Sequence, residues 1–128
     1  MNKIFLLSCT LMLSCTSTKN IVEDDKLTIV FGNGGGFVGI ETKYLLKSDG
    51  TLSRIINKDT TFLKQIPQEN VAHFFKEATA LKDYKYFRPD NIYQYVEINN
   101  NRIVWNVTTD GLDTSVITLY NNLKTLFK

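Results

Sequence analysis

The chain has 128 residues, of which 43% are hydrophobic, and this length suits one folded domain rather than several. Its 15 basic and 13 acidic residues leave a formal net charge of +2. Such a near balance gives no strong electrostatic preference for nucleic acid or for an anionic surface, and we expect no nucleic-acid partner.

The first segment carries the pattern of a bacterial lipoprotein signal, predicted at residues 1–14. Lys3 precedes an apolar run from Ile4 to Leu13, and a small residue stands directly before Cys15. The run is too short to cross a bilayer as a helix. A start at Cys9 would have a still shorter apolar run. We therefore expect cleavage before Cys15, lipidation of that cysteine and anchoring by two or three acyl chains.

The cysteine count follows from this processing, because cleavage removes Cys9 and the lipid occupies Cys15. The mature domain then has no internal disulfide, no thiol nucleophile and no cysteine-based metal site. Residues 15–26 are mostly polar and are expected to form a flexible tether. The location expected is the bacterial cell envelope, with the lipid in the outer membrane and the domain facing the periplasm.

Residues 27–128 are expected to form a single domain that begins with a strand over 27–31. Gly32 to Gly36 are expected to end this strand. Residues 37–47 alternate with a period of two, which predicts a second strand paired with the first. Its predicted inward face consists of Val38, Ile40, Thr42, Tyr44 and Leu46.

A tight turn at Ser48-Asp49-Gly50 is predicted to lead into a strand over 51–56, and a weaker extended segment follows over 60–66. Pro67 suits the first turn of a helix, because its missing N–H would have no intrahelical partner there. The apolar stripe of this helix is expected to be Val71, Phe74, Phe75, Ala78 and Leu81. Residues 82–91 are then a linker.

A second hairpin is predicted from strands 92–98 and 102–108, with its register open. A three-residue loop would place Tyr95 opposite Trp105, whereas a four-residue loop would place Val96 opposite Ile103. Asp113 is a good N-cap for a final helix with an apolar stripe. The fold class expected is therefore α+β, with the order β-β-β-(β)-α-β-β-α and an antiparallel sheet of four to six strands packed on one face by two helices.

Two motifs suggest chemistry but lack the context for it. Gly34 to Gly39 match G-x-G-x-x-G, yet an alternating strand follows where a dinucleotide site needs a helix. His73 is the single histidine and stands four residues before Glu77, too few ligands for zinc. We therefore expect no enzyme activity, no catalytic residues, no metal site and no cofactor.

Two segments are candidate partner-binding sites. The first is the glycine-rich run, whose bare backbone suits close approach to a partner. The second interleaves rings with basic residues and could form a patch for protein recognition, alone or with Tyr93 or Tyr95. The partner-binding residues predicted are Asn33, Gly34, Gly35, Gly36 and Phe37 in the first segment, and Tyr84, Tyr86 and Phe87 in the second.

The segment Gly35-Gly36-Phe37-Val38-Gly39-Ile40, which follows a strand, resembles the start of the emfourin family, protein inhibitors of thermolysin-like metallopeptidases. The order of later elements is similar as well. The resemblance implies steric occlusion of a peptidase cleft without covalent chemistry, and it carries over to Gly35, Gly36, Phe37 and Gly39. The sequence thus favours a non-enzymatic, membrane-anchored binding domain. The alternative is a structural or assembly lipoprotein that contacts an envelope protein through its aromatic face.

Overall fold

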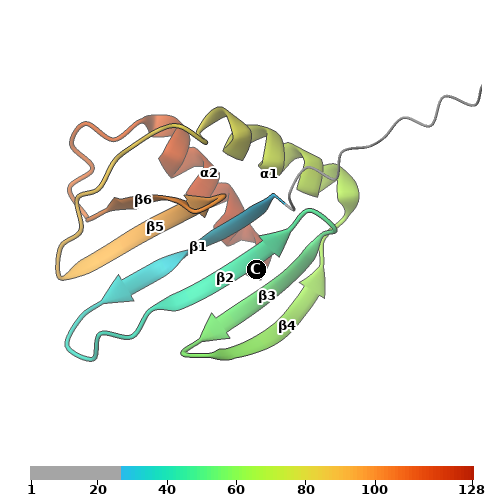
Figure 1. The fold of residues 1–128 in the computed structure, drawn as a ribbon, viewed down its shortest axis with the longest axis horizontal. Helices are drawn as coiled ribbons and strands as arrows, with labels where there is room; N and C mark the ends of the chain where they lie inside the picture. Colours follow the sequence, from blue (N-terminus) through green and yellow to red (C-terminus); the bar gives the residue numbers. More distant parts are fainter. Residues whose placement is uncertain (1–26) are drawn as a thin grey trace, which may run out of the picture.

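Six antiparallel strands form one sheet in the computed structural model, which describes residues 27–128 (Figure 1). The strands lie in the order β4-β3-β2-β1-β5-β6, so β1 is central. With two helices beside this sheet, the fold class is α+β. The elements are β1 (Thr28–Gly35), β2 (Thr42–Lys47), β3 (Thr51–Ile56), β4 (Asp59–Gln65), α1 (Gln68–Ala80), β5 (Ile92–Ile98), β6 (Asn101–Trp105), α2 (Thr114–Lys124) and a 3₁₀ turn, η1 (Thr125–Phe127).

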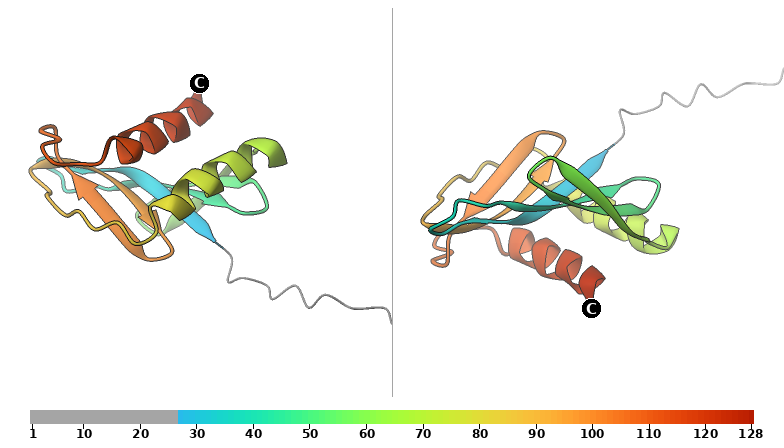
Figure 2. Two further views of the ribbon diagram at one scale, coloured as in Figure 1. Left: turned by 90° about the horizontal axis from the view of Figure 1, so that it is seen from above. Right: turned by 90° about the horizontal axis from the view of Figure 1, so that it is seen from below.

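The core lies on one face of the sheet, which we call the inner face. On β1, Ile29 and Phe31 point inward and are 0% and 1% exposed. Their pairing partners on β5 are Ile98 and Val96, which are also fully buried. Figure 2 shows the sheet and both helices in two further views. Side chains from both helices join the same apolar cluster, among them Val71 of α1 and Leu119 of α2. All members of this cluster lie between residues 29 and 126, so a protein of residues 16–128 retains the complete core.

The two helices begin differently. Asp113 caps α2 as predicted, because its carboxylate accepts the backbone N–H of Ser115 at 2.9 Å. Pro67, expected within the first turn of α1, is instead its N-cap residue with extended backbone, and α1 has no side-chain cap. The predicted apolar stripe of α1 is largely right: Val71, Phe74 and Ala78 are buried.

Gly32 to Gly36 were expected to end the first strand, but all of these residues except Gly36 belong to β1, which corrects the sequence-based prediction. β1 continues through Gly35. Gly32 and Asn33 pair with both β2 and β5, and Gly34 pairs with β5. β2 begins only at Thr42, so the predicted strand over 37–41 is wrong. Val38 and Ile40, expected to face inward, lie exposed in the connection between β1 and β2.

The register of the second hairpin places Val96 opposite Ile103, but the loop has two residues rather than three or four. Asn99 and Asn100 both have positive φ, 46° and 65°. Such a pair is typical of the type I′ turn, whose twist matches that of an antiparallel hairpin. β6 ends at Trp105, three residues before the predicted end.

The signal and tether predicted at residues 1–26, including the lipidation site Cys15, lie outside the residues that the structure describes. Within residues 27–128, no helix is long and apolar enough to span a membrane.

Candidate functional site: an apolar loop held at both ends

The connection between β1 and β2, residues 36–41, exposes three large apolar side chains; we call it the apolar loop. Phe37 is fully exposed, and Val38 and Ile40 are 77% and 49% exposed. The N–H of Gly39 donates to the carbonyl of Gly36 at 3.2 Å. This bond closes a four-residue turn in which Phe37 and Val38 are the two central residues. The turn therefore displays an aromatic and a branched side chain at its tip.

The first end of the apolar loop is fixed to the start of β5. Gly36 donates its N–H to the carbonyl of Asn91 at 2.6 Å. Gly35 has φ +94°, and a Cβ there would collide with the same carbonyl group. Only glycine satisfies both the backbone angle and the close approach, so Gly35 is required by the fold.

The second end is fixed by Glu41, which lies over the outer face of the sheet, the face opposite the core. Its Oε2 accepts hydrogen bonds from the hydroxyl of Tyr93 at 2.8 Å and from Arg102 at 2.6 Å. The ammonium of Lys43 lies 3.2 Å from its other carboxylate oxygen. One carboxylate thus connects the loop to β5, β6 and β2, over sequence separations of 52 and 61 residues for the first two.

Electrostatics keeps this carboxylate charged. Burial alone would raise the pKa of Glu41, but the hydrogen bonds from Arg102, Tyr93 and Lys43 outweigh it and lower the pKa to about 2. The hydrogen bond to Glu41 in turn raises the pKa of the Tyr93 hydroxyl above its ordinary value. The ion pair between Glu41 and Arg102 therefore persists across the neutral and mildly acidic range.

Glycines make room for the rings on the outer face. Gly32 pairs with Tyr95 and Gly34 with Tyr93 across β1 and β5. A Cβ on Gly34 would meet the Tyr93 ring, and one on Gly32 would meet the Tyr95 hydroxyl and a carbonyl of β2. Tyr95 is 0% exposed, and the guanidinium of Arg102 stacks over its ring at 3.9 Å. Burial raises the pKa of the Tyr95 hydroxyl well above its ordinary value.

Beside Glu41 the outer face is hollowed. The hollow has a volume of about 440 Å³ and is lined by Glu41, Phe87, Pro89, Tyr93, Arg102 and Val104. Phe87 reaches it because residues 86–88 run parallel to β6 and pair with Val104. Phe87 is 69% exposed, so one wall of this hollow is an uncovered ring.

The predicted site residues fall into separate places. Gly35, Gly36 and Phe37 form the base and tip of the apolar loop, Gly34 lies under Tyr93, and Asn33 lines an inner-face pocket described below. Tyr84 and Tyr86 are half-buried, and their hydroxyls bond to backbone groups that precede α2: Tyr84 accepts from the N–H of Asp113 at 3.0 Å, and Tyr86 donates to the carbonyl of Asp110 at 2.7 Å. Both rings therefore hold the linker 82–91 in place.

Sequence reasoning missed Glu41 and Arg102 as supports of the loop. The alternation of β6 puts Arg102 and Val104 on the same face of the sheet. Only the correct hairpin register also puts Tyr93 and Tyr95 of β5 on that face. By contrast, His73 and Glu77 are four residues apart in the chain, and their side chains lie 3.4 Å apart on the surface of α1.

Fold and site together define a class: an α+β domain that displays an apolar loop supported from both ends. No protein-family model matches the chain, and no curated protein matches it either. Within residues 27–128, no group of three or more histidine, cysteine, aspartate and glutamate side chains could hold a metal ion.

Proposed function

We propose that this protein is a non-enzymatic binding domain that binds a protein partner through its apolar loop. The observation that carries the proposal is the full exposure of Phe37 at the tip of a turn whose two ends are hydrogen-bonded to the sheet. A rigid aromatic side chain that projects into water is the usual anchor of a protein interface, since a partner pocket can desolvate it completely. Holding the loop in its bound conformation reduces the entropy lost on binding.

The most concrete version of this proposal is inhibition of a thermolysin-like metallopeptidase. The resemblance to the emfourin family covers Gly35, Gly36, Phe37 and Gly39, and three of these are glycines with positive φ that shape the loop. In this version the loop enters the peptidase cleft and blocks it sterically.

The proposal includes a lipid on Cys15, the tether 15–26 and a location at the outer membrane facing the periplasm. β1 starts at Thr28, next to the tether, and ends at Gly35, next to the loop. At about 3.3 Å per residue, eight residues of strand separate these points by roughly 25 Å. Tether and loop thus lie at opposite ends of one strand, which leaves the loop free to meet a partner away from the anchor.

The test is a titration of thermolysin with purified residues 16–128. We expect stoichiometric loss of peptidase activity and at least tenfold weaker inhibition by Phe37→Ala. Phe62→Ala is the matched control, because Phe62 is a 61% exposed phenylalanine on the edge strand β4. Full activity of several thermolysin-like enzymes in the presence of excess protein would reject the peptidase version. Equal effects of both substitutions would reject the loop as the contact.

A second candidate function is assembly with another envelope protein through the aromatic face. The observation that favours it is the exposed ring of Phe87 beside the outer-face hollow. Phe87→Ser should then abolish co-purification of the partner, while Phe37→Ala should not. Tyr84 and Tyr86 are left unchanged in this test, because their hydroxyls hold the linker.

A further inference from the structure

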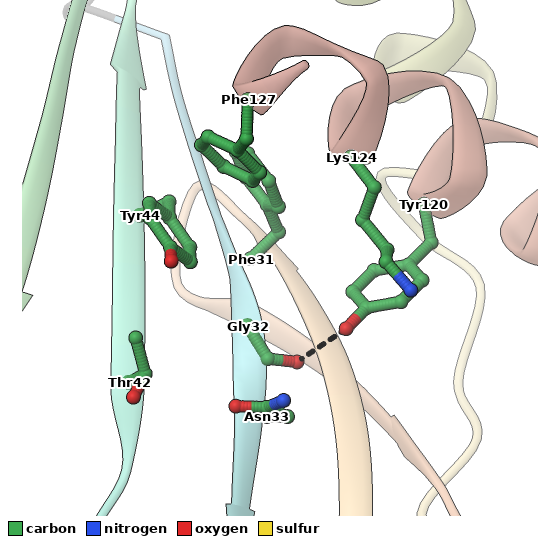
Figure 3. Close-up of a pocket in the computed structure, with 8 residues that line it drawn as sticks. All are labelled: Phe31, Gly32, Asn33, Thr42, Tyr44, Tyr120, Lys124 and Phe127. Atoms are coloured by element: carbon green, nitrogen blue, oxygen red, sulfur yellow. Dashed lines mark hydrogen bonds between the residues drawn. The ribbon is translucent and has the colours of Figure 1, made fainter. Parts of the chain in front are cut away.

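A pocket of about 250 Å³ lies on the inner face, between β1, β2 and the C-terminal end of α2, with its eight lining residues shown in Figure 3. Its wall is aromatic. The ring centroids of Phe31 and Tyr44 lie 5.6 Å apart, and Phe127 lies 5.7 Å from the first and 4.1 Å from the second. Tyr120 closes another side and is fixed there, because its hydroxyl donates to the carbonyl of Gly32 at 3.2 Å.

Polar groups surround the mouth of this pocket. Lys124 extends from α2 beside the ring of Tyr120, with its ammonium 5.4 Å from the ring centroid (Figure 3). Among residues 27–128 this ammonium has no carboxylate partner within ion-pair distance. Asn33 and Thr42 face each other across β1 and β2 at the same mouth. The pocket therefore combines an apolar wall with one cation and two hydrogen-bonding side chains.

These features restrict the ligand. A volume of about 250 Å³ is below the usual range of cofactor sites and matches a group of side-chain size. Lys124 favours an anion, and the aromatic wall favours an apolar body attached to it. The C-terminal end of α2 carries a negative partial charge, which disfavours every anion and disfavours a multiply charged phosphate most. Among anions with an apolar body, a singly charged carboxylate therefore has the smallest electrostatic cost beside Lys124.

We propose that this pocket binds the C-terminal residue of a peptide or protein when that residue is apolar, with its side chain against the rings and its carboxylate at Lys124. Asn33 and Thr42 then supply hydrogen bonds to the last peptide unit. This binding site is distinct from the partner-binding site proposed at the apolar loop, and it does not require a peptidase as partner. It gives Asn33 a role on the inner face, whereas the glycines beside it serve the outer face.

The test uses ¹⁵N-labelled residues 16–128 and two forms of one tripeptide, N-acetyl-Gly-Gly-Phe as the free acid and as the C-terminal amide. The amide resonances of residues 31–33, 42–44 and 120–127 should shift and saturate, and the acid should bind at least tenfold more tightly than the amide. Lys124→Gln should reduce the affinity of the acid to that of the amide. Lys76→Gln is the matched control, because Lys76 is an exposed lysine on α1, and it should change neither affinity.

Three results would overturn the inference. The first is equal binding of acid and amide, and the second is unchanged affinity of the acid in the folded Lys124→Gln protein. The third is a set of shifted resonances outside the pocket. N-acetylphenylalanine distinguishes a peptide end from a free acid, because affinity equal to that of the tripeptide would contradict recognition of the preceding peptide unit. Lys124 is exposed, so its substitution should leave the melting temperature unchanged and the result interpretable.

Discussion

Gly35 and Gly36 stand side by side with positive φ, yet alanine at the two positions should have very different effects. Both residues have backbone angles that L-residues rarely adopt, φ +94° and +79°. A Cβ on Gly35 would collide with the backbone carbonyl of Asn91, the residue directly before the neighbouring strand β5. A Cβ on Gly36 would meet no atom within 4 Å. The comparison thus separates backbone strain from steric collision within one dipeptide.

The expected magnitudes follow from these two terms. Positive φ costs an alanine roughly 1–2 kcal/mol at either position. The collision at Gly35 forces the ends of β1 and β5 apart, which adds about 1–3 kcal/mol, the usual cost of overpacking. We expect Gly35→Ala to destabilise the domain by about 3 kcal/mol and Gly36→Ala by about 1 kcal/mol. For a domain of this size each kcal/mol lowers the melting temperature by roughly 4–8 °C.

Thermal unfolding of residues 16–128, followed by far-ultraviolet circular dichroism, measures both variants against the parent protein. Equal losses, or a larger loss for Gly36→Ala, would show that the close approach to Asn91 does not constrain the fold. The folded Gly36→Ala protein is also the informative variant for binding, because it alters the loop while the sheet beneath it remains intact.

Three further predictions concern stability. The pKa of the Glu41 carboxyl is lowered from 4.5 to about 2 in the folded protein. Its stabilising effect is therefore present above pH 4.5 and is lost as the pH falls toward 2. In urea unfolding, Glu41→Gln should lower the free energy of unfolding by about 2 kcal/mol at pH 6 and by almost nothing near pH 2. Asn100 has φ 65° in the type I′ turn, so Asn100→Gly should raise the free energy of unfolding by about 0.5 kcal/mol. Tyr84→Phe leaves the N–H of Asp113 without its acceptor and should cost about 1–2 kcal/mol in the same assay.

A different result would contradict each of these three predictions. Parallel pH profiles of the parent and Glu41→Gln proteins would mean that the carboxylate contributes no pH-dependent stability. A loss of stability in Asn100→Gly would contradict the turn type. Stability of Tyr84→Phe equal to that of the parent would mean that water replaces the tyrosine hydroxyl at Asp113.

Local patterns in the sequence predicted much of the fold. The cap at Asp113, the apolar stripe of α1 and the turn before β3 depend on residues close together in the chain, and each could be inferred from spacing. The α+β class followed from the number and order of such elements. The hairpin register was left open, and one of its two alternatives, with Val96 opposite Ile103, is the observed one. The loop was expected to be longer because three asparagines follow one another, although two asparagines with positive φ suffice for a type I′ turn.

The site itself was only partly predictable, because its contacts are non-local. Gly32 and Gly34 were expected to end β1, since glycine weakens strands in isolation. They instead accommodate tyrosines that follow about 60 residues later, and this pairing cannot be recognised before the sheet order is known. Glu41 likewise gains its role from Arg102, 61 residues away. Phe37 was named as a candidate because of the glycines beside it, whereas its full exposure became visible only in the structure.

The central position of β1 has a mechanical consequence. The chain enters this strand at Thr28 and leaves it at Gly35 for the apolar loop, while β2 and β5 bond to its two sides. A force between the N-terminal side and a partner held by the loop therefore runs along the extended backbone of β1, from Thr28 to Gly35. Covalent bonds carry this load, and the hydrogen bonds to β2 and β5 lie beside its path. Tension on the line along which the domain is proposed to bind thus places little load on the rest of the sheet.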